Sequence, residues 1–249
     1  MPAAVLVLGG LDPSGGAGLQ ADIQTLTALG CHPLPVATCL TVQDGVRCLA
    51  SHPVPPALVA GQVRALRRRF DVRAVKLGAA GGIWSPDVLD TLPRDVPWVV
   101  DPVLAAGGGG QLSEPDPAAW EILWPQTFLL TPNPLELSAL TGEADTARAA
   151  RCLLAQGVRH VLVTGGDAQT PDVINQLFGD QPMTWRLDRF QGRYRGTGCT
   201  LASAIAAGLA VGLPLKASIE QAQTFVSRAI SGAFALTEDV GLLNRRWQD

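Results

Sequence analysis

Short apolar runs alternate with longer amphipathic segments through the first two thirds of the chain. The runs are rich in Val and Leu and are bounded by Gly, Pro or polar residues, which is typical of parallel strands buried on both faces. Several of the amphipathic segments open with proline, as expected in a first helical turn. The predicted strands are Val5–Leu8, Val36–Leu40, Val72–Leu77, Trp98–Val100, Phe128–Leu130 and Val161–Val163, and the predicted helices are Ala17–Leu29, Pro56–Phe70, Pro86–Leu92, Pro117–Leu123, Pro134–Leu140 and Ala147–Gln156.

The last third of the chain has a different pattern. Two alternating segments, Asp172–Phe178 and Met183–Phe190, predict a strand pair joined by Gly179-Asp180. Two long helices are predicted after them, an alanine-rich one over Thr200–Val211 and a second over Leu215–Leu236. Strands that alternate with helices are typical of an α/β fold with a mainly parallel sheet, and residues 1–249 are predicted to form a single domain.

The composition supports a folded chain and argues against several partners. A hydrophobic content of 47% provides a sizeable core, and a net charge of −3 gives no electrostatic footprint for nucleic acid. No apolar run is long enough to span a bilayer, and the first residues lack the charged region of a signal peptide. The five cysteines form no C-x-x-C pair, which favours a reducing compartment, so we expect a cytoplasmic protein.

The strongest candidate for a ligand site is Gly196-Thr197-Gly198-Cys199-Thr200, which directly precedes the alanine-rich helix. The first backbone N–H groups of a helix lack partners, and glycines let an anion approach them closely. The sequence therefore predicts a phosphate-binding helix start. The positive end of the helix would also lower the pKa of the Cys199 thiol. The alternative is an ordinary glycine-rich helix start with a buried structural cysteine.

A second glycine-rich segment, Gly9–Asp22, joins the first predicted strand to the first predicted helix. This junction lies at the ligand-facing edge of a parallel sheet. The segment matches neither G-x-G-x-x-G nor the P-loop pattern. Its two carboxylates, Asp12 and Asp22, are candidate ligand contacts; the alternatives are a local Asx turn at Asp12 and a solvated helix position for Asp22.

Three further polar residues follow predicted strands. Asp101 ends the strand Trp98–Val100, which places a carboxylate over the binding edge of the sheet. Asn133 and Glu136 are three residues apart, and their hard oxygens would suit a hydrated Mg²⁺ ion. The alternative is a helix capping box made by the same two side chains.

Taken together, these segments resemble the hydroxymethylpyrimidine kinase branch of the ribokinase superfamily, over about residues 4 to 235. The motifs occur in the family's order. They are D-P-S-G-G-A-G-L-Q-A-D at Asp12–Asp22, T-x-x-T-x-Q-D at Thr38–Asp44, K-L-G at Lys76–Gly78, D-P-V at Asp101–Val103, T-P-N-x-x-E at Thr131–Glu136, a K-G-G-like element at Thr164–Asp167, and G-T-G-C-T at Gly196–Thr200.

The resemblance implies a three-layer α/β/α ribokinase-like fold, a homodimer, and a reaction that uses ATP and Mg²⁺.

 The implied reaction is the phosphorylation of 4-amino-5-hydroxymethyl-2-methylpyrimidine in thiamine biosynthesis, with the phosphorylation of its monophosphate as an open second step. The residues that the resemblance implicates are Gly10, Asp12, Asp22 and Gln43 for the substrate, Asp101, Thr164, Gly166 and Asp167 for the nucleotide, Asn133 and Glu136 for the metal, and Cys199 with the amides of Gly196, Thr197 and Gly198 for catalysis.

The chain departs from the family pattern in its lysines. It has two, Lys76 and Lys216, and neither stands where the family places cations, after D-P-V and before Gly-Gly. Arg193 or Arg195 is the candidate substitute. The glycine-rich motif that accompanies the second phosphorylation is not recognisable at Val240–Asn244, so that step stays open. Two alternatives also stay open: a pyridoxal or pyridoxine kinase, and a vitamin-binding protein that has lost catalysis.

Overall fold

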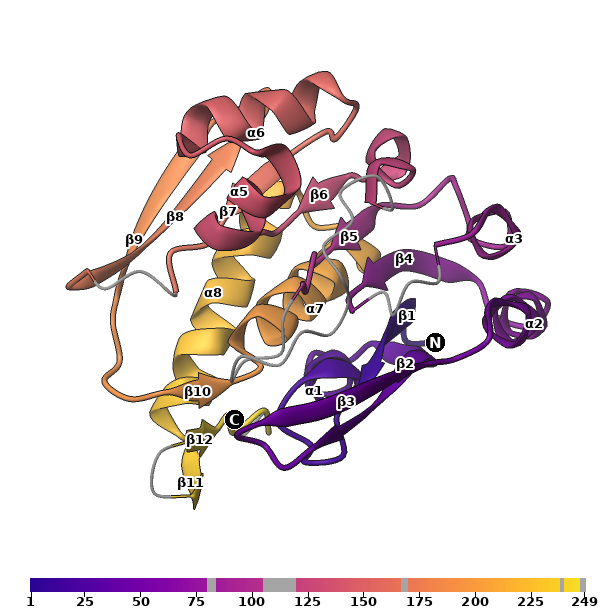
Figure 1. The fold of residues 1–249 in the computed structure, drawn as a ribbon, viewed down its shortest axis with the longest axis horizontal. Coiled ribbons are helices and arrows are strands. Elements are labelled where there is room, and N and C mark those ends of the chain that lie inside the picture. The colour runs from indigo at the N-terminus through magenta and orange to yellow at the C-terminus, as the bar shows by residue number, and fades with distance from the viewer. Residues whose placement is uncertain (80–83, 105–119, 167–169, 238–239, 247–249) are drawn as a thin grey trace.

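The computed structural model describes residues 1–79, 84–104, 120–166, 170–237 and 240–246. Within these residues the dominant element is a nine-stranded sheet with the order β3-β2-β1-β4-β5-β6-β7-β8-β9 (Figure 1). Its central strands pair in parallel; they are β1 (Ala4–Leu11), β2 (His32–Gln43), β4 (Val72–Leu77), β5 (Trp98–Val100), β6 (Leu129–Leu130) and β7 (Val161–Val163). The mainly parallel sheet that the apolar runs predicted is confirmed.

Antiparallel strands complete the sheet at both ends. At one end β3 (Cys48–Pro53) pairs with β2, and at the other β8 (Asp172–Phe178) and β9 (Met183–Asp188) form the predicted strand pair. Pro33 and Pro35 lie in β2 outside the stretch that pairs with β3. Because β3 does not pair with this part of β2, the missing N–H groups of the two prolines cost no hydrogen bond to β3.

The two faces of the sheet are covered by separate sets of helices, because alternate strand residues point to opposite faces. In β1, Leu6 and Leu8 belong to one core, whereas Val5 and Val7 belong to the other. The first core is closed by α2 (Pro56–Arg67), α3 (Pro86–Leu89), α5 (Pro134–Thr141) and α6 (Thr146–Ala155), and the second by α1 (Gly18–Ala28), α7 (Thr197–Ala210) and α8 (Leu215–Ser231). The result is the expected three-layer α/β/α arrangement.

A small second sheet, which the sequence pattern did not predict, lies beside the start of α7. Its strands are β10 (Tyr194–Arg195), β12 (Val240–Leu242) and β11 (Phe234–Thr237), in that order (Figure 1). The helix predicted over Leu215–Leu236 is too long, since α8 ends at Ser231 and β11 follows. β11 pairs with the neighbouring β12, whereas β10 pairs with β12 from far away in the sequence. Strands of two to four residues are too short to give a clear periodicity, so the sequence pattern does not reveal them.

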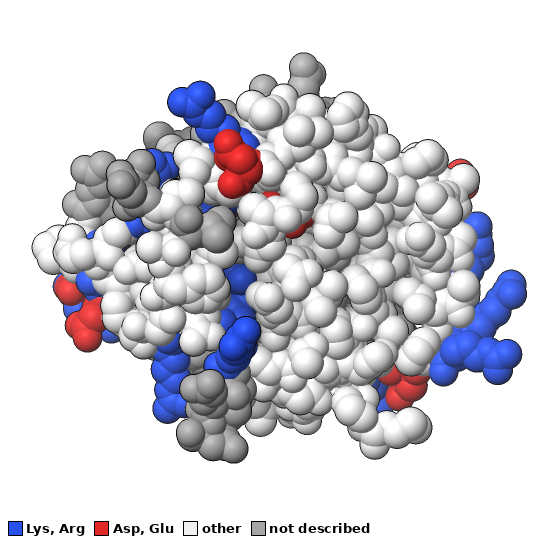
Figure 2. Space-filling view, turned by 90° about the horizontal axis from the view of Figure 1, so that it is seen from below, with Lys and Arg blue, Asp and Glu red and all other residues white. Residues whose placement is uncertain are grey.

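The remaining described structure adds a short 3₁₀ helix, η1 (Trp124–Gln126). The predicted helix Pro117–Leu123 lies partly outside the described residues. The four consecutive glycines Gly107–Gly110 lie entirely outside them. No helix among the described residues is long and apolar enough to cross a membrane. On the face shown in Figure 2, the Lys and Arg side chains of the described residues lie in small groups among uncharged residues.

Candidate active site

A cleft of about 620 Å³ opens at the carboxyl ends of the parallel strands. This is the edge at which open α/β sheets bind ligands. The structure brings nearly all of the candidate residues to its lining, namely Gly10, Asp12, Asp22, Gln43, Asp101, Asn133, Glu136, Thr164, Gly166, Gly196, Thr197, Gly198 and Cys199. Asp167 lies outside the described residues. The roles assigned to these residues stay predictions.

The carboxylate of Asp12 shapes the turn between β1 and α1. Its Oδ1 accepts hydrogen bonds from the backbone N–H and the hydroxyl of Ser14, at 2.9 and 2.6 Å, and its Oδ2 accepts from the N–H of Ala17 at 3.0 Å. The Asx turn considered for Asp12 is thus confirmed. Gly18 has a φ of +56°, and a Cβ at this position would collide with the carbonyl oxygen of Gly10. The turn therefore requires glycine at position 18.

A buried cluster of charges forms the floor of the cleft. The ammonium group of Lys76 lies 3.1 Å from Oδ1 of Asp22 and 3.6 Å from Oδ2 of Asp101. The hydroxyl of Ser203, on α7, donates to Oδ1 of Asp22 at 2.7 Å. Asp22 is 0% exposed, so the solvated helix position considered for it is wrong.

The charged forms of Lys76 and Asp101 are stabilised to different extents in this cluster. Burial by itself would lower the pKa of Lys76, but the attraction of Asp22, and then of Cys199 and Asp101, outweighs burial and raises that pKa. Burial raises the pKa of Asp101, and Lys76 opposes that shift without cancelling it. The floor of the cleft therefore holds a firmly protonated lysine beside a carboxylate that is less well compensated.

The start of α7 presents unpartnered donors to the cleft. Gly196 is the N-cap with a φ of 75°, and it offers no side chain to accept from the first turn. A Cβ on Gly196 would collide with the carbonyl oxygen of Gly16, so this close approach of two loops also requires glycine. The amides of Thr197, Gly198 and Cys199 belong to the first turn of the helix, where N–H groups have no intrahelical acceptor. This is the open helix start that the motif predicted, and its binding of an anion stays a prediction.

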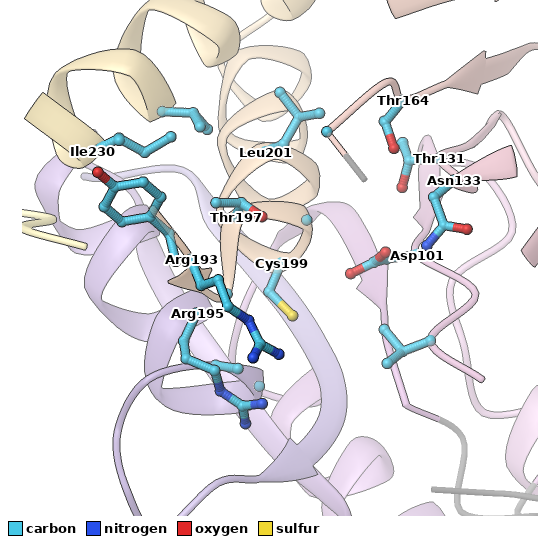
Figure 3. A pocket seen from close by; sticks show the side chains of 18 of the residues that line it. Asp101, Thr131, Asn133, Thr164, Arg193, Arg195, Thr197, Cys199, Leu201 and Ile230 are labelled. Atoms are coloured by element: carbon cyan, nitrogen blue, oxygen red, sulfur yellow. The ribbon is translucent and has the colours of Figure 1, made fainter. Parts of the chain in front are cut away.

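The thiol of Cys199 behaves differently from the prediction. Burial raises its pKa to about 12, against the opposing effect of Lys76. The expected lowering of this pKa by the helix start is therefore wrong, because the loss of water around the sulfur outweighs the positive field. Figure 3 shows the thiol facing across the cleft toward Asp101, and a hydrogen bond from the thiol favours the charged form of that carboxylate.

Arg195 connects the loop that precedes α7 to the opposite wall of the cleft. Its Nη2 donates to Oε1 of Gln43 at 2.6 Å and lies 3.5 Å from Oδ2 of Asp12. The amide nitrogen of Gln43 in turn donates to the hydroxyl of Thr41 at 2.7 Å. The guanidinium of Arg195 therefore holds the side-chain amide of Gln43 in one orientation. The sequence alone did not predict this role for Arg195.

Arg245, from the segment after β12, is a second arginine whose role sequence reasoning missed. Its Nη2 donates to the carbonyl oxygen of Gly16 at 2.7 Å, and its Nε donates to the hydroxyl of Thr200 at 2.8 Å. That hydroxyl donates to the carbonyl oxygen of Gly196 at 2.7 Å. Arg245 thus joins the two glycine-rich turns. No local motif marks it, because its partners lie elsewhere in the sequence.

The far wall of the cleft is built around the Gly165-Gly166 turn after β7. Arg189 donates to the carbonyl oxygens of Gly166 and Gly165, at 2.7 and 2.9 Å. The side chain of Asn175 accepts from the N–H of Gly165 at 3.0 Å and donates to Gln223 at 2.9 Å. The turn that follows Thr164 is therefore held from two sides.

Asn133 and Glu136 form the capping box of α5. Oδ1 of Asn133 accepts from the N–H of Glu136 at 2.8 Å, and Oε2 of Glu136 accepts from the N–H of Asn133 at 3.0 Å. The capping interpretation is confirmed. It commits one oxygen of each side chain to the helix start and leaves both residues in the lining of the cleft.

Comparisons with known proteins agree with this geometry. A family model described as phosphomethylpyrimidine kinase matches residues 12–244. The hydroxymethylpyrimidine/phosphomethylpyrimidine kinase of Rhizobium meliloti (strain 1021) is 36% identical, with 100% of both chains covered. The protein of the same name from Streptomyces coelicolor is 35% identical, with 99% of this chain and 95% of that protein covered.

Solved structures give the same fold. The pyridoxal kinase from Staphylococcus aureus in complex with ADP has a TM-score of 0.86 at 27% identity, with 98% of this chain and 94% of that chain covered. The phosphomethylpyrimidine kinase from Clostridium difficile 630 has a TM-score of 0.76 at 28% identity, with 91% of this chain and 99% of that chain covered. On the family match and the full-length relatives together, the chain belongs to the phosphomethylpyrimidine kinase family.

Proposed function

We propose that the protein transfers the terminal phosphate of ATP to the hydroxymethyl group of 4-amino-5-hydroxymethyl-2-methylpyrimidine, and then phosphorylates the resulting monophosphate. One observation carries the proposal: the open amides at the start of α7 face the cleft beside the buried Lys76–Asp22–Asp101 cluster. Full-length relatives named hydroxymethylpyrimidine/phosphomethylpyrimidine kinase support the choice of acceptor.

The acceptor ring would lie between the β1–α1 turn and the tip of β2. Gln43 provides an amide that is held in one orientation by Arg195 and Thr41, and such a fixed amide suits the polar edge of a pyrimidine. Backbone groups at Gly10 and Asp12 would complete the contacts. The carboxylate of Asp22 already contacts Lys76 and Ser203, so it would lie beneath the ring as part of the floor of the cleft.

The nucleotide would occupy the other half of the cleft. Thr164 and Gly166 line the cleft at the turn after β7 and would contact the phosphates, and Asp167 is assigned the same role from the sequence. The apolar side chains of Leu187, Val226 and Ile230 line the same cleft and would cover the base. The solved complexes of a related pyridoxal kinase with ADP and with AMP-PCP support nucleotide use on this fold.

The donors around the cleft fit a Mg²⁺ ion held mainly by phosphates. Oδ2 of Asp101 is buried without a hydrogen-bond partner, and Asn133 and Glu136 line the same cleft. Among the described residues no group of three or more His, Cys, Asp or Glu side chains could hold a metal ion alone. Phosphate and water oxygens would supply the remaining ligands, and the ion would neutralise charge on the transferring group.

Cys199 would orient the acceptor hydroxyl. With a pKa of about 12 the thiol is protonated at neutral pH, so it serves as a hydrogen-bonding group rather than a standing base. In the transfer, the hydroxyl oxygen would form a bond to the terminal phosphorus while the bond between that phosphorus and the ADP oxygen breaks, and the hydroxyl proton would pass to solvent water. Because phosphoryl transfer depends mainly on positioning, we expect Cys199→Ala to lower kcat by about 10²-fold and Cys199→Ser to retain more activity.

An assay of ADP release tests the proposal with three acceptors: the hydroxymethylpyrimidine, its monophosphate and pyridoxal. We expect turnover with both pyrimidines and phosphorylated products of the matching mass. Pyridoxal is included because the structure of a pyridoxal kinase superposes on this chain with a TM-score of 0.86. Turnover with pyridoxal alone would select that alternative. Tight pyrimidine binding without ADP release would identify a vitamin-binding protein instead.

A further inference from the structure

Four cationic side chains line the cleft within the described part of the chain: Lys76, Arg189, Arg193 and Arg195. Three of them are committed to the protein. Lys76 is paired with Asp22 and Asp101. Arg189 donates to the carbonyl oxygens of the Gly165-Gly166 turn, and Arg195 donates to Gln43 beside Asp12.

Arg193 is different. Its side chain is exposed to the cleft and has no hydrogen-bond or ion-pair partner among the described residues. Figure 3 shows it on the same wall of the cleft as Cys199, across from Asp101 and Asn133. A cation in this position is available to a ligand without the loss of an existing contact.

The backbone that carries Arg193 is held in place. Its carbonyl oxygen accepts from the N–H of Gly241, in β12, at 2.9 Å. The next residue, Tyr194, lies in β10 and pairs with Gly241 of β12. The hydroxyl of Tyr194 donates to the carbonyl oxygen of Gln191 at 2.6 Å. The guanidinium therefore extends from a fixed base, which reduces the conformational entropy lost when it binds an anion.

A guanidinium beside the amides of a helix start is well matched to a phosphate. The amides of α7 donate from partial charges, whereas arginine adds a full charge and two parallel donors. We propose that Arg193 is the side chain that contacts the phosphoryl group in transfer. This inference rests on the proposed kinase function and names the cation for its central step.

Binding measurements test the inference without turnover. We expect Arg193→Ala to weaken the affinity for AMP-PCP by about tenfold or more, since a charge-assisted contact to the terminal phosphate is lost. Affinity for ADP, which lacks that phosphate, should stay within about twofold. Arg151→Ala is the matched control, because Arg151 is an exposed arginine on α6 outside the cleft. An equal loss of affinity for both nucleotides would overturn the inference.

Turnover gives a second readout. Arg193→Ala should lower kcat by about 10²–10³-fold with either pyrimidine acceptor. Arg193→Lys, or added guanidinium chloride at concentrations that leave the protein folded, should restore part of that loss. A loss confined to the monophosphate would place the guanidinium on the acceptor's own phosphate and overturn the inference, as would wild-type turnover of Arg193→Ala. Inactivity of the wild-type protein itself would instead count against the proposed function.

Discussion

The ammonium group of Lys76 and the carboxylate of Asp22 form a contact of 3.1 Å that joins β4 to α1 beneath the cleft. Both side chains are almost completely withdrawn from solvent, at 1% and 0% exposure. Asp101 lies on the other side of the same ammonium group. A single cation thus separates two buried carboxylates that come from different elements, so it matters to the fold as well as to the site.

Replacement of Lys76 by Met should destabilise the protein strongly. The substitution leaves Asp22 and Asp101 buried without a countercharge, and breaking such a cluster costs about 3–5 kcal/mol. Lys216→Met is the matched control: Lys216 pairs with Glu220 at 4.0 Å on the surface of α8, and exposed pairs contribute about 1 kcal/mol or less. Urea unfolding of the two variants checks the prediction. Equal free energies of unfolding would contradict it.

Two glycine substitutions should separate backbone strain from steric collision. Both Gly18 and Gly30 have positive φ, at +56° and +75°. A Cβ on Gly30 meets nothing within 4 Å, so Gly30→Ala should cost about 1–2 kcal/mol and leave turnover unchanged. A Cβ on Gly18 collides with the carbonyl oxygen of Gly10.

Gly18→Ala should therefore unfold at a lower urea concentration than Gly30→Ala. It should also raise the KM for the pyrimidine several-fold, because the displaced Gly10 backbone lines the acceptor side of the cleft. If both variants bind the acceptor as the wild type does, the β1–α1 turn has no part in substrate recognition.

Cys199 should resist alkylation at mildly alkaline pH. Its pKa of about 12 leaves little thiolate at pH 8, whereas Cys152 is exposed on α6. We expect iodoacetamide to modify Cys152 well before Cys199, as read by peptide mass spectrometry. Rapid modification of Cys199 at pH 8 would show that the thiol is activated after all.

The same thiol predicts a pH dependence of stability. Above its ordinary pKa of 9.0 the unfolded chain gives up a proton that the folded protein keeps until about pH 12. The unfolded state then binds fewer protons, so this group makes stability fall as the pH rises from 9 toward 12. Comparison of the unfolding of wild type and Cys199→Ala over that window isolates the contribution, which should be absent from the variant.

Arg245→Ala should impair catalysis through the position of the anion-binding loop. Arg245 contacts Gly16 and Thr200 but does not line the cleft among the described residues. A small displacement of catalytic groups costs up to about 10²-fold in rate, so kcat should fall while the KM for the pyrimidine changes less. The exposed neighbour Arg246 is the control, and Arg246→Ala should match the wild type. Equal kcat values for the two variants would remove the positioning role.

Local patterns predicted much of this molecule. Apolar runs predicted the parallel strands, and the spacing of Asn133 and Glu136 predicted the capping box as one of two interpretations. The Gly196–Thr200 motif predicted the open helix start, because that geometry depends on neighbouring residues.

What the sequence did not reveal depends on distant partners. The pKa of Cys199 is set by burial beside Asp22, Lys76 and Asp101, and β10 forms because β12 lies beside it. The tasks of Arg195 and Arg245 likewise follow from contacts across most of the chain. Residue type and spacing carry no signal for such contacts, whereas the assembled fold shows them directly.

The contacts of Arg245 also bear on the order in which the molecule assembles. The hydrogen bonds to Gln24 and Gly16 close loops of 221 and 229 residues, so they form between nearly the first and nearly the last segments of the chain. Closing long loops is entropically costly, and such contacts form late in folding. During synthesis, the β1–α1 turn emerges from the ribosome long before the residue that ties it to α7. A partly made chain can therefore hold most of the sheet while its two glycine-rich turns are still not joined.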